Sequence, residues 1–143
     1  MDNLYRDFIL EHYRNPHNKG ALPDADLSFG DSNPSCGDEM SMTLKLDGGD
    51  RIADVAFDGR GCAISQASGS ILTDDLRGKT LDEVKQLDPG ELLTNLGVPI
   101  GPARLKCALL SYKVLQGAVI GSEARWPDEA DLAVTSGEGG VSP

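Results

Sequence analysis

MSMTLKLDGGDRIADVAFDGRGC, residues 40–62, is the stretch that decides the fold of this chain. Apolar and polar side chains alternate over residues 40–46, which is the period of a strand with one buried face. The segment DGGD at 47–50 then predicts a hairpin turn. On the return strand, the expected buried face is Ala53, Val55 and Phe57, and the expected outer face is Ile52, Asp54 and Asp58. An antiparallel hairpin packed on one side is therefore predicted, with a weaker strand signal before it at 27–31.

Helical patterns flank this hairpin on both sides. Apolar residues recur every four positions from Ile64 until Gly78, a residue type that commonly ends helices. Little of the segment after Pro102 is polar, so we expect a long helix there to lie against the sheet. The predicted helices are 4–13, 64–76, a short one with Thr80 as N-cap and Glu83 as its capping-box partner, 89–96, and the long one from Pro102.

Length and cysteine content limit the class of protein. A chain of 143 residues is long enough for one domain with a core that needs no disulfides. Its three cysteines are an odd number, no charged and apolar leader is evident, and no segment is long and apolar enough to span a membrane. We therefore expect a cytoplasmic protein with reduced thiols and no membrane association.

The charge is strongly acidic. A formal net charge of -10 argues against a nucleic-acid partner, because phosphate binding relies on clustered Lys and Arg. Acidic residues lie among Gly, Ser and Pro in the last part of the chain. The expected division is a domain at 1–121 and an acidic, flexible tail at 122–143.

Four side chains with metal-ligand chemistry fall at the ends of the predicted elements. They are Cys36 in the loop before the hairpin, Asp38 two residues later, Cys62 just after the return strand, and Cys107 near the start of the long helix. If that helix packs across this end of the sheet, the three thiols meet and Asp38 reaches the same point. Thiolates are preferred ligands of zinc and iron–sulfur clusters, and one carboxylate can complete a four-coordinate shell.

Core packing is the alternative for each cysteine, because free cysteine often behaves as a small buried hydrophobe and no C-x-x-C is present. The glycines beside Cys36 and Cys62 favour the site, since ligand loops need unusual backbone angles. Helix starts, with Arg104 and Lys106 near the last cysteine, also favour thiolate. His12 and His17 are interpreted as caps or surface residues, because neither has a second histidine at metal-ligand spacing.

Four motifs in order resemble one family. They are HYRNPHNKG at 12–20, NPSCGD at 33–38, FDGRGCAISQAS at 57–68 and PARLKCALLSYK at 102–113. Over about residues 3–120 the chain is similar to iron–sulfur cluster assembly proteins of the SufU, IscU and NifU N-terminal type. The resemblance implies an α+β fold with a three-stranded antiparallel sheet and helices packed on one face. It also implies that Cys36, Asp38, Cys62 and Cys107 form the metal or cluster site.

Lys106 stands where the IscU branch has a histidine, which points to the SufU branch. That branch implies zinc as cofactor and sulfurtransferase activity, with persulfide sulfur accepted from a SufS-like cysteine desulfurase. Cys36 is then the first candidate for the acceptor and Cys107 the second. One alternative is a non-enzymatic scaffold that assembles a transient [2Fe-2S] cluster on the same four residues and passes it to apoproteins, with other Suf components as partners. Another is a structural zinc domain.

Overall fold

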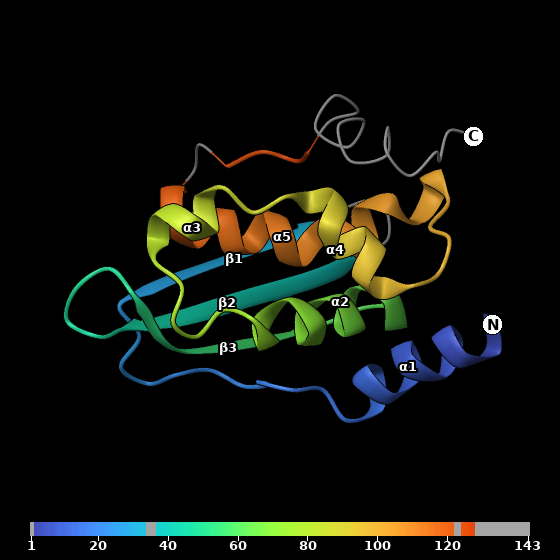
Figure 1. Cartoon of the computed structure of the whole chain (residues 1–143), viewed down its shortest axis with the longest axis horizontal. Helices are drawn as coiled ribbons and strands as arrows, with labels where there is room; N and C mark the ends of the chain where they lie inside the picture. Colours follow the sequence, from blue (N-terminus) through green and yellow to red (C-terminus); the bar gives the residue numbers. More distant parts are fainter. Residues whose placement is uncertain (1, 34–36, 122–123, 128–143) are drawn as a thin grey trace.

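Three antiparallel strands, with helices on one of their faces, form the architecture in the computed structural model, which describes residues 2–33, 37–121 and 124–127 (Figure 1). The elements in chain order are α1 (Asp2–Arg14), β1 (Leu27–Asn33), β2 (Asp38–Leu46), β3 (Ile52–Arg60), α2 (Ala63–Asp74), α3 (Leu81–Lys85), α4 (Pro89–Leu96), a 3-10 turn (Pro102–Arg104) and α5 (Leu105–Ile120). The predicted α+β class and three-stranded sheet are confirmed. Most of the predicted tail, at 122–123 and 128–143, lies outside the described residues.

The sheet has the order β1-β2-β3, and both pairs are antiparallel. Buried and exposed residues alternate along most of β2, which is the pattern of a strand with one covered face. The outer edge of β3 is protected by the preceding connection. The Phe57 N–H donates to the Asn18 carbonyl, and the Phe57 carbonyl accepts from the Gly20 N–H, each at 2.8 Å. This pairing covers part of the edge of β3 and holds segment 17–20 against the sheet.

One detail of the predicted hairpin is wrong. Ala53 is exposed and Ile52 is 1% exposed, the reverse of the expected faces. The cause is a register shift, because Lys45 pairs with Asp54 while the next residue, Leu46, pairs with Ile52. The extra residue, Ala53, is a bulge, which breaks strict alternation and turns Ile52 toward the core.

The core lies between the sheet and the helices. Its largest fully buried side chains include Phe57, Met42 and Leu44 from the strands and Leu110 and Leu115 from α5. Helix α5 packs across β1 and β2, and α2 packs on β3 and against α1 and α5 (Figure 1). Helix α2 therefore runs through the middle of the helical layer, with one end at the end of β3.

The helix boundaries follow local signals. Thr80 and Glu83 form the predicted capping box at the start of α3. The segment from Pro102 opens as a single 3-10 turn, and the long helix α5 begins at Leu105. Across the described ranges, no helix combines the length and the apolar character that a membrane span requires.

Candidate metal centre

The predicted ligands gather where β2 begins and β3 ends. Asp38 is the first residue of β2 and pairs with Asn33, the last residue of β1. Strand β3 ends at Arg60, and Cys62 is the N-cap of α2. Cys107 is the third residue of α5. Strand ends and helix starts therefore place these side chains at one end of the molecule, as the sequence predicts.

Asp38, Cys62 and Cys107 direct their side chains into one small volume. One ligand atom from each residue lies within 4.8 Å of the others. Asp38 and Cys107 are both 3% exposed, whereas Cys62 is partly exposed. Cys36, the fourth predicted ligand, lies outside the described residues. Three of the four predicted ligand residues are thus close together.

The Asp38 carboxylate is already oriented toward the thiols. The backbone N–H of Cys62 donates to Asp38 Oδ1 at 3.1 Å, and the Cys62 thiol donates to Oδ2 at 3.5 Å. A buried carboxylate needs such partners, because burial of an uncompensated charge is costly. The start of α2 supplies one of them through its free N–H and its positive dipole end. The carboxylate can therefore offer Oδ2 to a cation bound between the thiolates.

Gly61 makes this approach possible. Its φ is +156°, and a Cβ added there would lie 2.5 Å from Asp38 Cγ and closer still to Oδ1. A residue with a side chain would therefore push the carboxylate away from Cys62. Glycine at this position, one residue before a predicted ligand, is a local requirement of the site.

A cavity of about 500 Å³ opens beside these side chains. Its lining consists of Gly37, Asp38, Arg60, Gly61, Cys62, Ala103, Arg104 and Cys107. Arg60 and Arg104 line this cavity and are exposed, so both place positive charge beside it; the sequence predicts this role only for Arg104. Lys106 is directed elsewhere, since its Nζ lies 5.4 Å from the centre of the Trp126 ring.

The donor set fits zinc better than a hard cation. Two thiolates and one carboxylate are typical of zinc or iron–sulfur ligation, whereas magnesium and calcium prefer oxygen ligands throughout. Three protein ligands leave room for a fourth, from a further side chain or from a bound substrate. The described residues can therefore hold a zinc ion, and the cavity gives a partner access to it.

The family follows from comparison with known proteins. A family model described as the NifU-like N-terminal domain matches residues 4–126, which is most of the chain. The chain belongs to this family. The match includes all four motifs and all four predicted ligand residues, and it reaches Trp126.

Two relatives and one solved structure are similar to this NifU-like chain over most of its length. It is 39% identical over 140 residues to the zinc-dependent sulfurtransferase SufU of Bacillus subtilis, covering 86% of this chain and 94% of the relative. It is 36% identical to the iron–sulfur cluster assembly scaffold protein IscU of Streptococcus pyogenes, covering 83% and 84%. Among solved structures, a protein from Fervidobacterium islandicum that is described as a putative iron–sulfur cluster assembly scaffold protein for the SUF system has a TM-score of 0.70 and 31% identity, covering 79% of this chain and 94% of that one.

Proposed function

We propose that this chain is a zinc-dependent sulfur acceptor in iron–sulfur cluster assembly, which takes persulfide sulfur from a SufS-like cysteine desulfurase. The observation that carries the proposal is the convergence of Asp38, Cys62 and Cys107 beside an open cavity. The identity to a zinc-dependent sulfurtransferase over most of both chains supports it. Zinc would be held by these three residues and Cys36, and when bound it would keep the thiols deprotonated and shielded until a partner docks.

The transfer itself conserves electrons. A thiolate of this chain attacks the outer sulfur of the desulfurase persulfide, so that a new S–S bond forms as the old one breaks. The desulfurase cysteine leaves as a thiolate, and the sulfane sulfur is now carried as a persulfide on this chain. No external oxidant or reductant is needed.

Cys36 is the first candidate for the acceptor and Cys107 the second. Burial of Cys107, at 3% exposed, weighs against it, because its thiolate would need a local opening before a partner's persulfide could reach it. The exposed Arg60 and Arg104, which line the cavity, would attract an anionic persulfide.

Asp38 is the ligand most suited to exchange. Its oxygen is harder than the thiolates and binds zinc less strongly than they do, so its release would open a coordination position while the thiolates retain the ion. The Cys62 N–H would continue to hold the freed carboxylate near the site, at the 3.1 Å contact described above.

The alternative function is a scaffold that assembles a [2Fe-2S] cluster on the same residues and transfers it to apoproteins. The identity to the streptococcal scaffold protein favours it specifically. Both functions use one site, so they differ in what the thiolates carry: sulfur alone, or sulfur together with iron.

A desulfurase activation assay with matched variants tests the proposal. Zinc content and stimulation of a cysteine desulfurase are measured for Cys36→Ser, Cys107→Ser and Asp38→Asn. Asp58→Asn is the control, because that carboxylate lies near the same end of β3 but is half exposed and pairs with Lys19. We expect Cys36→Ser to abolish stimulation, Asp38→Asn to change zinc retention, and Asp58→Asn to change neither. Full stimulation by Cys36→Ser would exclude Cys36 as acceptor, and full stimulation by zinc-free protein would exclude the zinc-dependent mechanism.

A further inference from the structure

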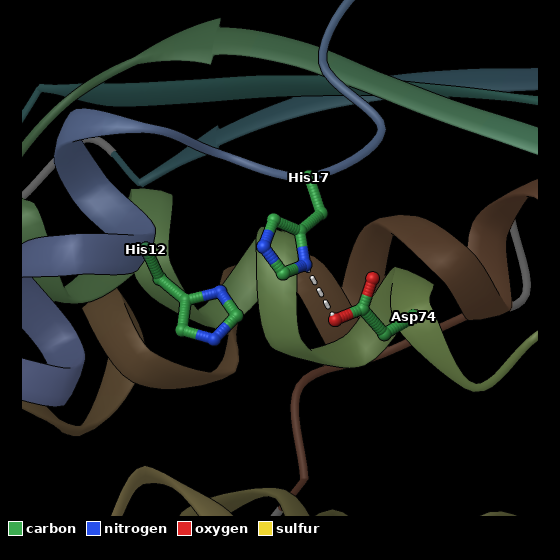
Figure 2. A group of neighbouring side chains, drawn as sticks. All are labelled: His12, His17 and Asp74. Atoms are coloured by element: carbon green, nitrogen blue, oxygen red, sulfur yellow. Dashed lines mark hydrogen bonds and ion pairs between the residues drawn. The ribbon is translucent and has the colours of Figure 1, made fainter.

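A second group of metal-ligand side chains lies at the other end of α2, away from the cysteines. Figure 2 shows His12 from the end of α1, His17 from the following loop and Asp74, the last residue of α2, turned toward one another. One ligand atom from each of these residues lies within 4.8 Å of the others. Cys62 caps the start of α2, so about 18 Å of helix, at 1.5 Å per residue, separates the two groups.

His12 is held firmly in this group. It is 7% exposed, so the interpretation of this residue as a cap or surface residue is wrong. A 2.7 Å hydrogen bond joins its Nδ1 to Ser70 Oγ, and the same oxygen accepts the backbone N–H of His17 at 2.8 Å. A hydrogen bond on one ring nitrogen fixes the orientation of an imidazole and leaves the other nitrogen for a ligand.

Hydrogen bonds also position His17 and Asp74. His17 Nδ1 donates to Asp74 Oδ2 at 2.7 Å, and Asn18 Nδ2 donates to Asp74 Oδ1 at 3.1 Å and to Thr73 Oγ1 at 3.0 Å. Asn18 has a φ of +62°, the left-handed conformation that Asn tolerates better than most residues. The carboxylate thus has a second hydrogen-bond partner that does not depend on the histidine.

The spacing suits a tetrahedral ion. Zinc bonds of about 2.0 Å to nitrogen or oxygen separate neighbouring ligand atoms by about 3.3 Å. The His17–Asp74 contact of 2.7 Å lies below this separation, and the 4.8 Å limit for the group lies above it. The side chains of His17 and Asp74 are 52% and 39% exposed, so both can shift by the few tenths of an ångström that an ion between them requires.

The protonation state of His12 also suits a ligand. Burial, together with the neighbouring His17, lowers the pKa of His12, although Asp74 and Glu11 oppose this change. The lowered pKa favours the neutral imidazole, which is the form that binds a metal. The centres of the two imidazole rings are 4.6 Å apart, and the Asp74 carboxylate accepts a hydrogen bond from His17 beside them. A divalent cation between them would bind all three side chains.

We propose that His12, His17 and Asp74 form a second metal site, which binds zinc or a similar divalent transition ion independently of the cysteine site. Two imidazoles and a carboxylate supply three ligands, and solvent supplies the fourth at the exposed side. Imidazole and carboxylate ligands suit zinc, and the acidic chain favours cation binding in general. A metal ion bound there would link the end of α1 and segment 17–18 to the end of α2.

Imidazole ¹⁵N chemical shifts in the full chain test this proposal without any activity measurement. The chain has two histidines, both in this group, so their ring nitrogens report on this site alone while the thiols bind a first equivalent of zinc. We expect a second equivalent to shift the ring nitrogens of both histidines together. His17→Asn and Asp74→Asn should each weaken this second binding event by about 10- to 100-fold.

Asp75→Asn is the matched control, because Asp75 is the next acidic residue along the chain and is also exposed but is not one of the clustered ligands. It should bind the second equivalent as wild type does. The backbone N–H of His17 makes the contact to Ser70, so His17→Asn keeps it, and thermal unfolding verifies that each variant folds. Unchanged imidazole shifts in excess zinc would overturn the proposal, and so would equal zinc affinity in Asp74→Asn and wild type.

Discussion

Gly61→Ala should damage the proposed metal centre without altering any of its predicted ligands. An added Cβ would lie 2.5 Å from Asp38 Cγ, whereas ordinary contact begins at 3.4 Å, so the carboxylate must retreat by about 0.9 Å. That movement breaks the 3.1 Å hydrogen bond from the Cys62 N–H. Loss of a hydrogen bond to a charged group costs about 1.5–3 kcal/mol, and an alanine at φ +156° adds about 1–3 kcal/mol of backbone strain.

A second glycine separates the effect of backbone strain from the effect of displacing the Asp38 carboxylate. Gly78 has a φ of +91°, and a Cβ there would meet nothing within 4 Å, so Gly78→Ala carries the strain alone. Zinc affinity is measured by competition with a chromophoric chelator, and stability by denaturant unfolding of the zinc-free chains. Both variants should lose stability, but only Gly61→Ala should lose zinc affinity, by about 10- to 100-fold. Equal zinc affinity in the two variants would refute the role of Gly61 in positioning Asp38.

Two further predictions concern the stability of the fold. Burial raises the pKa of Asp31 on β1, but the hydrogen bond from Lys113 on α5, the hydrogen bond from the Ser32 N–H and the charge of Lys113 together outweigh burial and hold that pKa below its usual value. The pair therefore stabilises the fold above pH of about 4, and its contribution disappears as the pH falls through the lowered pKa. Asp31→Asn should lower the free energy of unfolding by about 1 kcal/mol at neutral pH, and a loss that persists in acid would contradict this assignment. Thr80→Ala removes the capping box of α3 and should cost about 1 kcal/mol in denaturant unfolding. A control at the adjacent Lys79, which is partly buried and takes no part in the capping box, Lys79→Ala, should cost much less.

Local sequence patterns predict the elements that hold the cysteine site. Alternation in β2 and the capping residues of α3 act within a few residues, so the sequence carries them directly. The proximity of Asp38, Cys62 and Cys107 also follows from their local positions, because each lies at a strand end or a helix start at the same end of the molecule. The face of Ala53 was not predictable in this way, because a bulge depends on how two strands pair.

The histidine group, in contrast, cannot be predicted from local sequence patterns. His12 and Ser70 are 58 positions apart, and His17 and Asp74 are 57 apart, so no spacing in the sequence relates them. Only the packing of α1 on α2 brings them together. Trp126 is a similar case, since its contacts with Lys106 and Lys113 depend on the chain returning along α5.

The central proposal, zinc-dependent sulfur acceptance at the cysteine site, is tested most directly by the mass of the protein after a single turnover with a cysteine desulfurase. Zinc-loaded chain is mixed with the desulfurase and cysteine, alkylated, and analysed intact and as peptides. We expect the mass of one additional sulfur on the peptide that contains Cys36, dependent on zinc and absent from Cys36→Ser. A parallel sample also receives ferrous iron and a reductant. Unmodified zinc-loaded protein beside a fully active desulfurase, with a [2Fe-2S] cluster assembled on the chain in that parallel sample, would contradict the proposal and establish the scaffold function instead.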